Sequence, residues 1–442
     1  KPVCTDETIE AVSALFAEKG SNAWFEMDAA DILPKGFACP HCGKSAGFTK
    51  EEDTLDGWFD SGSTHFAAMK KDQGFWPATM YLEGLDQYRG WFQSSLLTAV
   101  GAFGEGAPFK ECVTHGWTVD GEGRAMHKSL GNGVDPADIF NENGADILRL
   151  WAASADYHAD VRCSKAIFQQ LSQNYLKFRN TCKFMLDNLV DFDPAHLTKA
   201  EDMPVLDRWL ITKLNELIEK VEQSYNDYEF HIITHAVNDF CVTTLSSFYL
   251  DIVKDRLYCE AADSAERRSA QTALYLTLST LAKLFAPILA FTCDEIWLAM
   301  PHTAEDDARN VVLNDMNKPF TAYALDAETM ARWEHIIEVR TAVNGALEEA
   351  RAAKVIGKSL EADVHLTVPE GDVFLADENP AALADLFIVS KVELTVGGEL
   401  AVKVENAAGT KCPRCWKHSL TPNAEGLCPR CAEVVRHLPD LL

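Results

Sequence analysis

The sequence of 442 residues contains no run of eighteen apolar residues, although 47% of its residues are hydrophobic. A helix needs about that many apolar residues to cross a bilayer, so no membrane-spanning segment is predicted. Positive charge is also scarce, because 40 Lys and Arg residues face 67 Asp and Glu residues. A net charge of −27 argues against nucleic-acid binding by bulk electrostatics, so phosphate contacts would need a local group of cations. No signal-peptide pattern opens the sequence, and we expect a cytoplasmic protein.

The thirteen cysteines do not have the spacing of a disulfide framework. Six of them form three C-x-x-C pairs, a spacing that favours metal binding in a cytoplasmic chain. Two pairs lie twelve residues apart near the C-terminus: Cys412 and Cys415, then Cys428 and Cys431. Four thiolates match the tetrahedral preference of Zn²⁺. The sequence therefore predicts one structural zinc ion, which stabilises a tail too short to build its own core.

Two features of the cysteine and charge pattern leave alternatives open. The pair Cys39 and Cys42 has no partner pair nearby, so Cys4 and His65 are conceivable further ligands and an unfilled half-site is equally compatible. The tail from Lys411 to Leu442 carries five basic and three acidic side chains. This small surplus fits either a phosphate-binding patch or an ordinary solvated surface.

Apolar periodicity divides the chain into segments at 1–160, 161–325, 326–410 and 411–442. The first segment mixes short apolar runs with Gly and Trp, as α/β domains do, and predicts a helix over 8–19 and a strand over 113–119 that runs into a glycine turn. The second has a helical period, with a helix after Pro204 and apolar stripes over 237–253 and 272–300 that Pro287 interrupts. The third predicts a helix over 328–354 and strands over 364–368 and 392–396. One face of the helix after Pro204 carries Leu206, Leu210, Leu214, Leu217, Ile218 and Val221.

Residues 123–132, GRAMHKSLGN, place a Lys-Ser pair between two glycines. Glycines give such a loop freedom to close, and a lysine ammonium on a flexible stem can follow a triphosphate as charge develops. Taken alone, the string is more typical of an ordinary solvated turn.

The loop resembles the flexible ATP-binding loop, KMSKS, of class I aminoacyl-tRNA synthetases, with Ala125 to Ser129 on its five positions. Further segments are similar to isoleucyl-tRNA synthetases, a subgroup of that family, and the closing C-P-R-C-W favours them over the valine and leucine enzymes. These segments are DGWFDSG at 56–62, YLEGLDQYRGWF at 81–92, HGW at 115–117, DRW at 207–209 and IGKSLEA at 356–362.

The resemblance implies a multidomain α/β and all-α fold. Residues 1–160 would be the C-terminal part of a Rossmann-type catalytic domain, 161–325 an antiparallel helix bundle that binds the anticodon, 326–410 an α+β junction and 411–442 the zinc tail. The implied activity is isoleucine–tRNA ligase, with L-isoleucine, ATP and tRNA(Ile) as substrates and Mg²⁺ accompanying ATP. Lys128 would be catalytic. The adenylate would contact Glu83, Gly84, Asp86 and Gln87, and ATP would contact Met126, Lys128 and Ser129.

The sequence departs from the family pattern in two respects. Ala125 and His127 remove one cation from the usual loop, and His127 could replace it in part only when protonated. The chain also contains no H-x-G-H string and no counterpart of the family's editing domain. We therefore expect the carboxyl-terminal half of a monomeric enzyme, inactive without an amino-terminal half. The alternatives are a non-catalytic tRNA-binding zinc protein and a valine or leucine enzyme.

Overall fold

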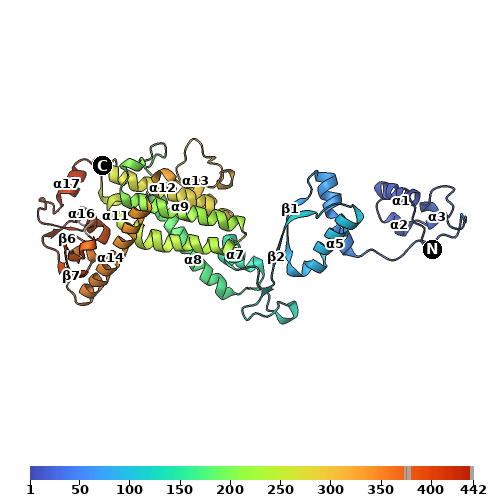
Figure 1. Ribbon diagram of the computed structural model, residues 1–442, viewed down its shortest axis with the longest axis horizontal. Helices are drawn as coiled ribbons and strands as arrows, with labels where there is room; N and C mark the ends of the chain where they lie inside the picture. The colour runs from blue at the N-terminus through green and yellow to red at the C-terminus, as the bar shows by residue number, and fades with distance from the viewer. Residues whose placement is uncertain (373–374, 376–379, 439–442) are drawn as a thin grey trace. The chain divides into compact units, whose positions relative to one another are not determined.

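In the computed structural model, which describes residues 1–372, 375 and 380–438, the chain forms two compact units, Lys1–His115 and Gly116–Leu442 (Figure 1). None of the helices in these residues is long and apolar enough to cross a membrane.

The first unit begins with three short helices, which are α1 (Asp6–Lys19), α2 (Ala23–Glu26) and α3 (Ala29–Ile32). Helix α1 confirms the helix predicted over 8–19. It starts at a capping box, in which the Thr5 hydroxyl accepts a hydrogen bond from the Thr8 amide and the Thr8 hydroxyl accepts one from the Thr5 amide. It ends at Gly20, whose φ of 78° suits a residue without a Cβ.

A βαβ arrangement occupies the later part of this unit. Strands β1 (Ala78–Gly84) and β2 (Phe109–His115) are parallel, and Gly84 pairs with His115 at their shared carboxyl edge. Tyr81, a residue of β1, has a buried side chain. Its ring stacks on that of Trp91 with centroids 4.5 Å apart, and its hydroxyl lies 2.9 Å from the Ser95 hydroxyl. The other helical elements are α4 (Gly57–Gly62), η1 (His65–Gln73), η2 (Leu85–Arg89), α5 (Trp91–Leu97) and η3 (Thr98–Ala102).

The single strand predicted over 113–119 is wrong. Strand β2 ends at His115, and β3 (Thr118–Val119) is a separate strand that pairs in parallel with β4 (Val161–Arg162). The break falls at Gly116, which passes close to another backbone segment. Its amide donates to the Tyr157 carbonyl at 2.8 Å, and a Cβ there would lie 2.4 Å from the Ala159 oxygen.

Helix α7 joins the start of the second unit to the helical bundle. The Asp146 carboxylate accepts hydrogen bonds from the Thr292 amide at 2.7 Å and the Thr292 hydroxyl at 2.6 Å. Arg149 donates to the carbonyls of Ile288 at 2.9 Å and Pro287 at 2.7 Å. The Asp146 carboxylate therefore matches the dipole at the start of α13, while Arg149 binds the turn between α12 and α13. The elements are η4 (Lys128–Leu130), α6 (Pro136–Asn143), α7 (Ala145–Ser154), α12 (Ala265–Phe285) and α13 (Ala290–Ala299).

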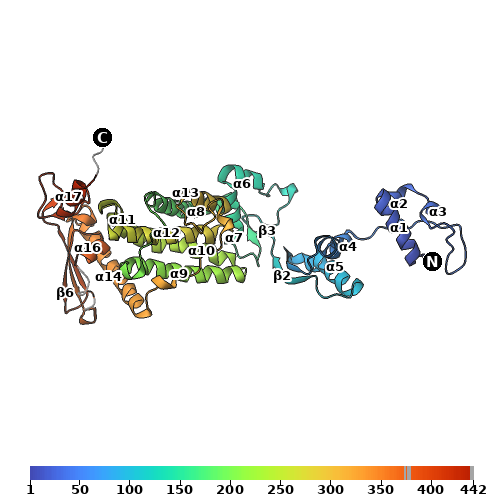
Figure 2. The same ribbon diagram turned by 90° about the horizontal axis from the view of Figure 1, so that it is seen from above.

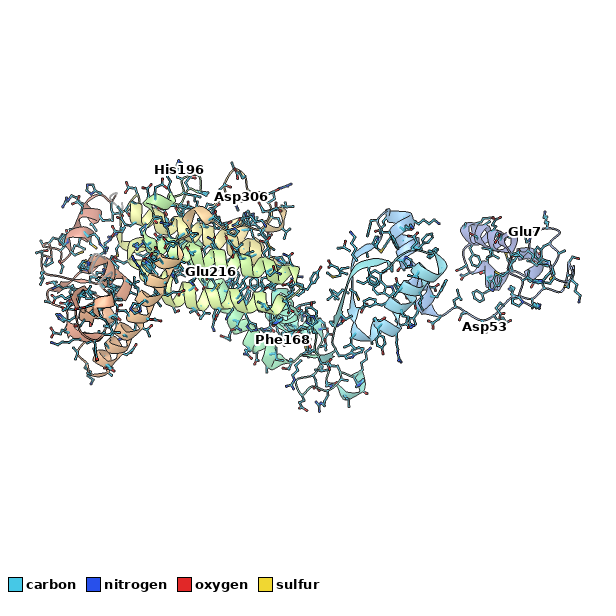
Figure 3. The ribbon with its side chains drawn as sticks, in the orientation of Figure 1. Glu7, Asp53, Phe168, His196, Glu216 and Asp306 are labelled. Carbon is cyan, nitrogen blue, oxygen red and sulfur yellow. The ribbon has the colours of Figure 1, made fainter. Side chains whose placement is uncertain are left out.

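Long helices form the bundle, and α8, α9 and α12 run alongside one another in Figures 1 and 2. The six apolar residues predicted on one face after Pro204 are all buried, and the interruption predicted at Pro287 separates α12 from α13. In Figure 3, Phe168 marks the buried side of α8, whereas Glu216 marks the exposed side of α9. The remaining elements are α8 (Lys165–Asp187), η5 (Ala200–Asp202), α9 (Val205–Asn226), α10 (Phe230–Asp239), η6 (Phe240–Tyr249), α11 (Leu250–Cys259), η7 (Val311–Leu313) and η8 (Thr321–Tyr323).

A small α+β region follows, with the sheet order β6-β5-β7. Strand β5 is parallel to β6 and antiparallel to β7, and its residues alternate between buried and half-exposed. The predicted helix and both predicted strands are confirmed, while β7 was not predicted. The elements are α14 (Ala327–Ala352), η9 (Ser359–Glu361), β5 (Ala362–Val368), η10 (Glu370–Asp372), α16 (Pro380–Phe387), β6 (Lys391–Val396) and β7 (Ala401–Asn406), then β8 (Thr410–Lys411), β9 (His418–Ser419) and α17 (Pro429–Arg436) in the tail.

Candidate functional site

The predicted adenylate-binding residues lie together at the carboxyl end of β1, in the first unit. Glu83 has an exposed carboxylate, and Gly84 leaves space that a Cβ would fill, 2.6 Å from the Asp86 Oδ1. Gln87 accepts a hydrogen bond from the Trp91 amide at 3.0 Å and donates to Asp86 at 3.1 Å. Gln87 thus caps α5 and orients Asp86, while Glu83 is left accessible to a ligand at a strand end, where α/β folds bind ligands.

The predicted ATP-binding residues lie in the second unit, between β3 and α6. Lys128 and Ser129 are exposed and begin the short turn η4, which ends at Gly131 with a φ of 60°. Within the residues described, Lys128 has no carboxylate partner. Met126 differs from both, because its side chain packs against the apolar cluster that includes Ile139 and Ile147. Its side chain anchors the loop on α6 and α7.

Asp120 is a residue of this loop that the sequence analysis missed. Its buried carboxylate accepts hydrogen bonds from the Asn132 amide group, from the Arg124 amide and guanidinium, and from the Glu122 amide. These donors, of which Asn132 has the largest effect, hold the pKa of the Asp120 carboxyl well below its usual range. An Asp directly before a glycine turn is common, so the only further signal was Asn132, twelve residues later.

The four tail cysteines meet as predicted, with their sulfur atoms all within 4.8 Å of one another. The Sγ atoms of Cys415 and Cys428 are 3.7 Å apart, close to the edge of about 3.8 Å in a tetrahedron with Zn–S bonds of about 2.3 Å. Burial opposes ionisation of Cys412, but backbone N–H groups, including those of Cys415 and Cys428, offset it and lower the pKa of the thiol to about 6. The cluster therefore fits a zinc ion.

The basic side chains of the tail bind acidic and carbonyl groups of the bundle and junction. Arg430, on α17, contacts the Asp255 carboxylate at 2.5 and 2.9 Å and the Glu260 carboxylate at 2.8 Å. Lys417 pairs with Asp385, and Arg414 donates to the carbonyls at the end of α11. Most of the cation surplus noted in the sequence is therefore used to dock the tail.

The pair Cys39 and Cys42 has the same backbone turn as Cys412 and Cys415. The Cys39 amide donates to the Lys44 carbonyl, and the Gly43 amide donates to the Cys39 carbonyl, both at 2.8 Å. Among the described residues, however, the tail cluster is the only group of three or more potential ligands close enough to hold a metal. His65, considered as a ligand, is buried between the Trp76 indole at 3.3 Å and the Thr98 hydroxyl at 3.2 Å, so that suggestion is wrong.

Two family models and several curated proteins match this chain. A family model described as tRNA synthetases class I (I, L, M and V) matches residues 1–164, and one described as anticodon-binding domain of tRNA ligase matches residues 207–366. The isoleucine–tRNA ligase of Moorella thermoacetica is 46% identical over 99% of this chain and 49% of its own length. The isoleucine–tRNA ligase of Carboxydothermus hydrogenoformans is 48% identical over 100% of this chain and 49% of its own length. The chain spans about half the length of the curated relatives it matches.

Among solved structures, this chain is similar to the agnB2 LeuRS of Agrobacterium radiobacter K84, which was solved in a ternary complex with tRNA and LeuAMS. The similarity covers 84% of this chain and 38% of the LeuRS chain. The TM-score is 0.50 at 16% identity, which supports a shared fold alone. The sequence relatives are more specific, because their identity extends over nearly the whole chain. The predicted resemblance is thereby confirmed: over nearly its whole length the chain is similar to isoleucine–tRNA ligases, and its segments match class I tRNA synthetases and an anticodon-binding domain.

Proposed function

We propose that this chain is the carboxyl-terminal portion of an isoleucine–tRNA ligase, which attaches L-isoleucine to tRNA(Ile) through an isoleucyl-adenylate. Identity of 46–48% to such ligases over nearly the whole chain supports this. Because the chain spans about half of those relatives, we expect activity to need an amino-terminal portion that carries the H-x-G-H motif.

Lys128 is the proposed catalytic residue. The observation that carries the proposal is its exposed ammonium, which has no carboxylate partner among the residues that the structure describes. When the isoleucine carboxylate attacks the α-phosphate of ATP, negative charge grows on the phosphate oxygens and on the departing pyrophosphate. An ammonium held in place stabilises that charge without reorganising at the moment of reaction. Ser129 can donate a hydrogen bond to the same phosphates, and Mg²⁺ would accompany ATP.

The edge of β1 is proposed to bind the adenylate. The Glu83 carboxylate can accept hydrogen bonds from an ammonium or a hydroxyl group. Gly84 allows close approach of the backbone, and Asp86 and Gln87 hold each other as the adjoining wall. In the second step, a terminal hydroxyl of tRNA(Ile) attacks the adenylate carbonyl and releases AMP.

The remaining segments are proposed to serve tRNA binding and stability. Residues 1–160 would belong to a Rossmann-type catalytic domain, 161–325 to the anticodon-binding bundle, 326–410 to the junction and 411–442 to the zinc tail. Cys412, Cys415, Cys428 and Cys431 would hold one zinc ion, which supplies folding energy and no reaction chemistry.

The test is isoleucine-dependent pyrophosphate exchange by the chain, with and without a co-expressed amino-terminal portion. We expect exchange only with both portions, and a loss of at least about 100-fold in Lys128→Ala, the size typical of removing a transition-state donor. Lys165→Ala is the matched control, because Lys165 is exposed and pairs weakly with Glu142 at 3.7 Å. Absence of exchange from both portions together, with tRNA still bound, would instead favour a non-catalytic tRNA-binding protein.

A further inference from the structure

Two side chains join the ends of the loop that carries Lys128. We propose that Asp120 and Asn132 are positioning residues that fix the base of this loop and thereby hold the Lys128 ammonium where the phosphates of ATP bind. The proposal rests on the proposed function of Lys128, and it assigns a role to two residues outside the five positions by which the loop is recognised.

The Asp120 carboxylate binds both ends of the loop at once. Its Oδ1 accepts hydrogen bonds from the amides of Glu122 at 3.0 Å and Arg124 at 2.9 Å. Its Oδ2 accepts from the Arg124 Nε at 2.8 Å and the Asn132 Nδ2 at 2.9 Å. The Asp120 side chain is only 8% exposed, so water competes little for these charge-assisted bonds. A single carboxylate thus connects two points of the chain that are twelve positions apart.

Asn132 then holds the backbone at the two positions that depart from the family pattern. Its Nδ2 also donates to the Ala125 carbonyl at 3.1 Å, and its Oδ1 accepts from the His127 amide at 2.9 Å. Ala125 forms a bridge with Val119 as well. Because these contacts use backbone atoms while both side chains are exposed, they do not depend on which residue occupies either position. The network therefore explains how the loop keeps its conformation with Ala and His there.

The same network selects Lys128 as the cation that reaches a ligand. Arg124 is the other permanently charged base between residues 123 and 132, all of which the structure describes. Its guanidinium is engaged by Asp120 and by Glu122 at 3.0 Å. Lys128 starts the next turn, which the Leu130 amide closes on the His127 carbonyl at 3.0 Å. Loss of the network would let this turn move and spread the ammonium over many positions.

Three variants test the network in the chain itself. Asn132→Ala removes all three hydrogen bonds of Asn132, and Asp120→Asn turns the Oδ2 acceptor into a donor that faces the Asn132 donor. Combining Asp120→Asn with Asn132→Asp restores a donor–acceptor pair between the two side chains and keeps the acceptor of the His127 amide. It leaves the Arg124 Nε and the Ala125 carbonyl without their partners, so it restores the network only in part. Asn141→Ala is the matched control, because Asn141 is an exposed residue of α6 without a side-chain hydrogen bond in the described structure.

Hydrogen exchange measures whether the network fixes the loop, independently of catalysis. We expect the His127 amide to exchange at least about tenfold faster in Asn132→Ala, since one hydrogen bond is lost. Amides of α9 should be unaffected, which shows that the variant is folded. Equal His127 exchange in Asn132→Ala and Asn141→Ala would overturn the proposal.

Pyrophosphate exchange, with the amino-terminal portion present, measures whether that fixation positions Lys128. We expect kcat to fall about tenfold or more in each single variant with the KM for isoleucine unchanged, and to recover in part in the reciprocal double variant. Unchanged kcat in variants whose loop exchanges faster would overturn the positioning role while leaving the ligase function intact. No exchange by the unmodified pair would instead overturn the ligase function and the role toward ATP together.

Discussion

Replacing Arg430 with alanine should weaken the docking of the tail and, through it, the affinity of the tail for zinc. Arg430 lies between two of the cysteines, and its guanidinium meets the carboxylates of Asp255 and Glu260. Removing one partner of a buried ion pair costs about 3–5 kcal/mol, whereas an exposed pair contributes about 1 kcal/mol or less. The Arg430 side chain is 33% exposed and both acids are 20% exposed, so we expect a cost of about 2 kcal/mol.

The zinc affinity should report the loss of these docking contacts, because only the folded, zinc-bound tail can dock on the bundle. If docking stabilises the zinc-bound form by about 2 kcal/mol, its loss should raise the apparent Kd for zinc about 30-fold. The assay is a competition titration of the whole chain against a chromophoric chelator at constant pH and salt. Arg436→Ala is the control on the same helix, since the pair of Arg436 with Glu433 is largely exposed, and it should change the Kd less than about threefold. Equal zinc affinities of the two variants would refute the coupling of docking to metal binding.

Three further outcomes follow from the same structure. Removing zinc with a chelator, or the change Cys412→Ser, should speed amide exchange in α17 and leave the buried amides of α12 protected, as mass-resolved hydrogen exchange can show. Leu281→Ala, at a fully buried site, should lower the free energy of unfolding by about 3 kcal/mol in urea titrations, against less than about 0.5 kcal/mol for Val190→Ala at an exposed site. Hydrogen bonds from Arg267 lower the pKa of Asp191 to about 2. Its ionised form therefore stabilises the fold above about pH 4, and this contribution is lost as the pH falls through about 2. Asp191→Asn should thus cost about 1 kcal/mol at pH 7, allowing for partial exposure, and much less at pH 2, which urea titrations at both pH values would test.

The long helices could be predicted from the sequence because their apolar residues recur with a helical period over many turns. Helix α9 shows this, since the face formed by its leucines is the face that is buried. The cysteine tail was equally predictable, because ligand spacing is a local property of the chain. Both predictions depend on residues close together in the sequence.

Predictions failed where distant segments meet. The strand expected over 113–119 has a suitable composition, but its break at Gly116 is set by the backbone near Ala159, more than forty residues later. The tail cations could be counted, yet their main partner Asp255 lies 175 residues before Arg430. Asp120 was overlooked because an isolated Asp before a glycine is typical of any turn, and its importance depends on Asn132.

The contacts of α7 with the turn at Pro287 limit how the loop at residues 123–132 can move. Five hydrogen bonds, three accepted by Asp146 and two donated by Arg149, fasten one turn of α7 to the bundle. Ile147, in that same turn, belongs to the apolar cluster on which Met126 anchors the loop. A tilt of the α12–α13 turn must therefore carry the base of the loop with it, or break these bonds. Movement of the loop relative to α7 is therefore confined to the turn at 128–131, which lies between the anchored residues Met126 and Asn132.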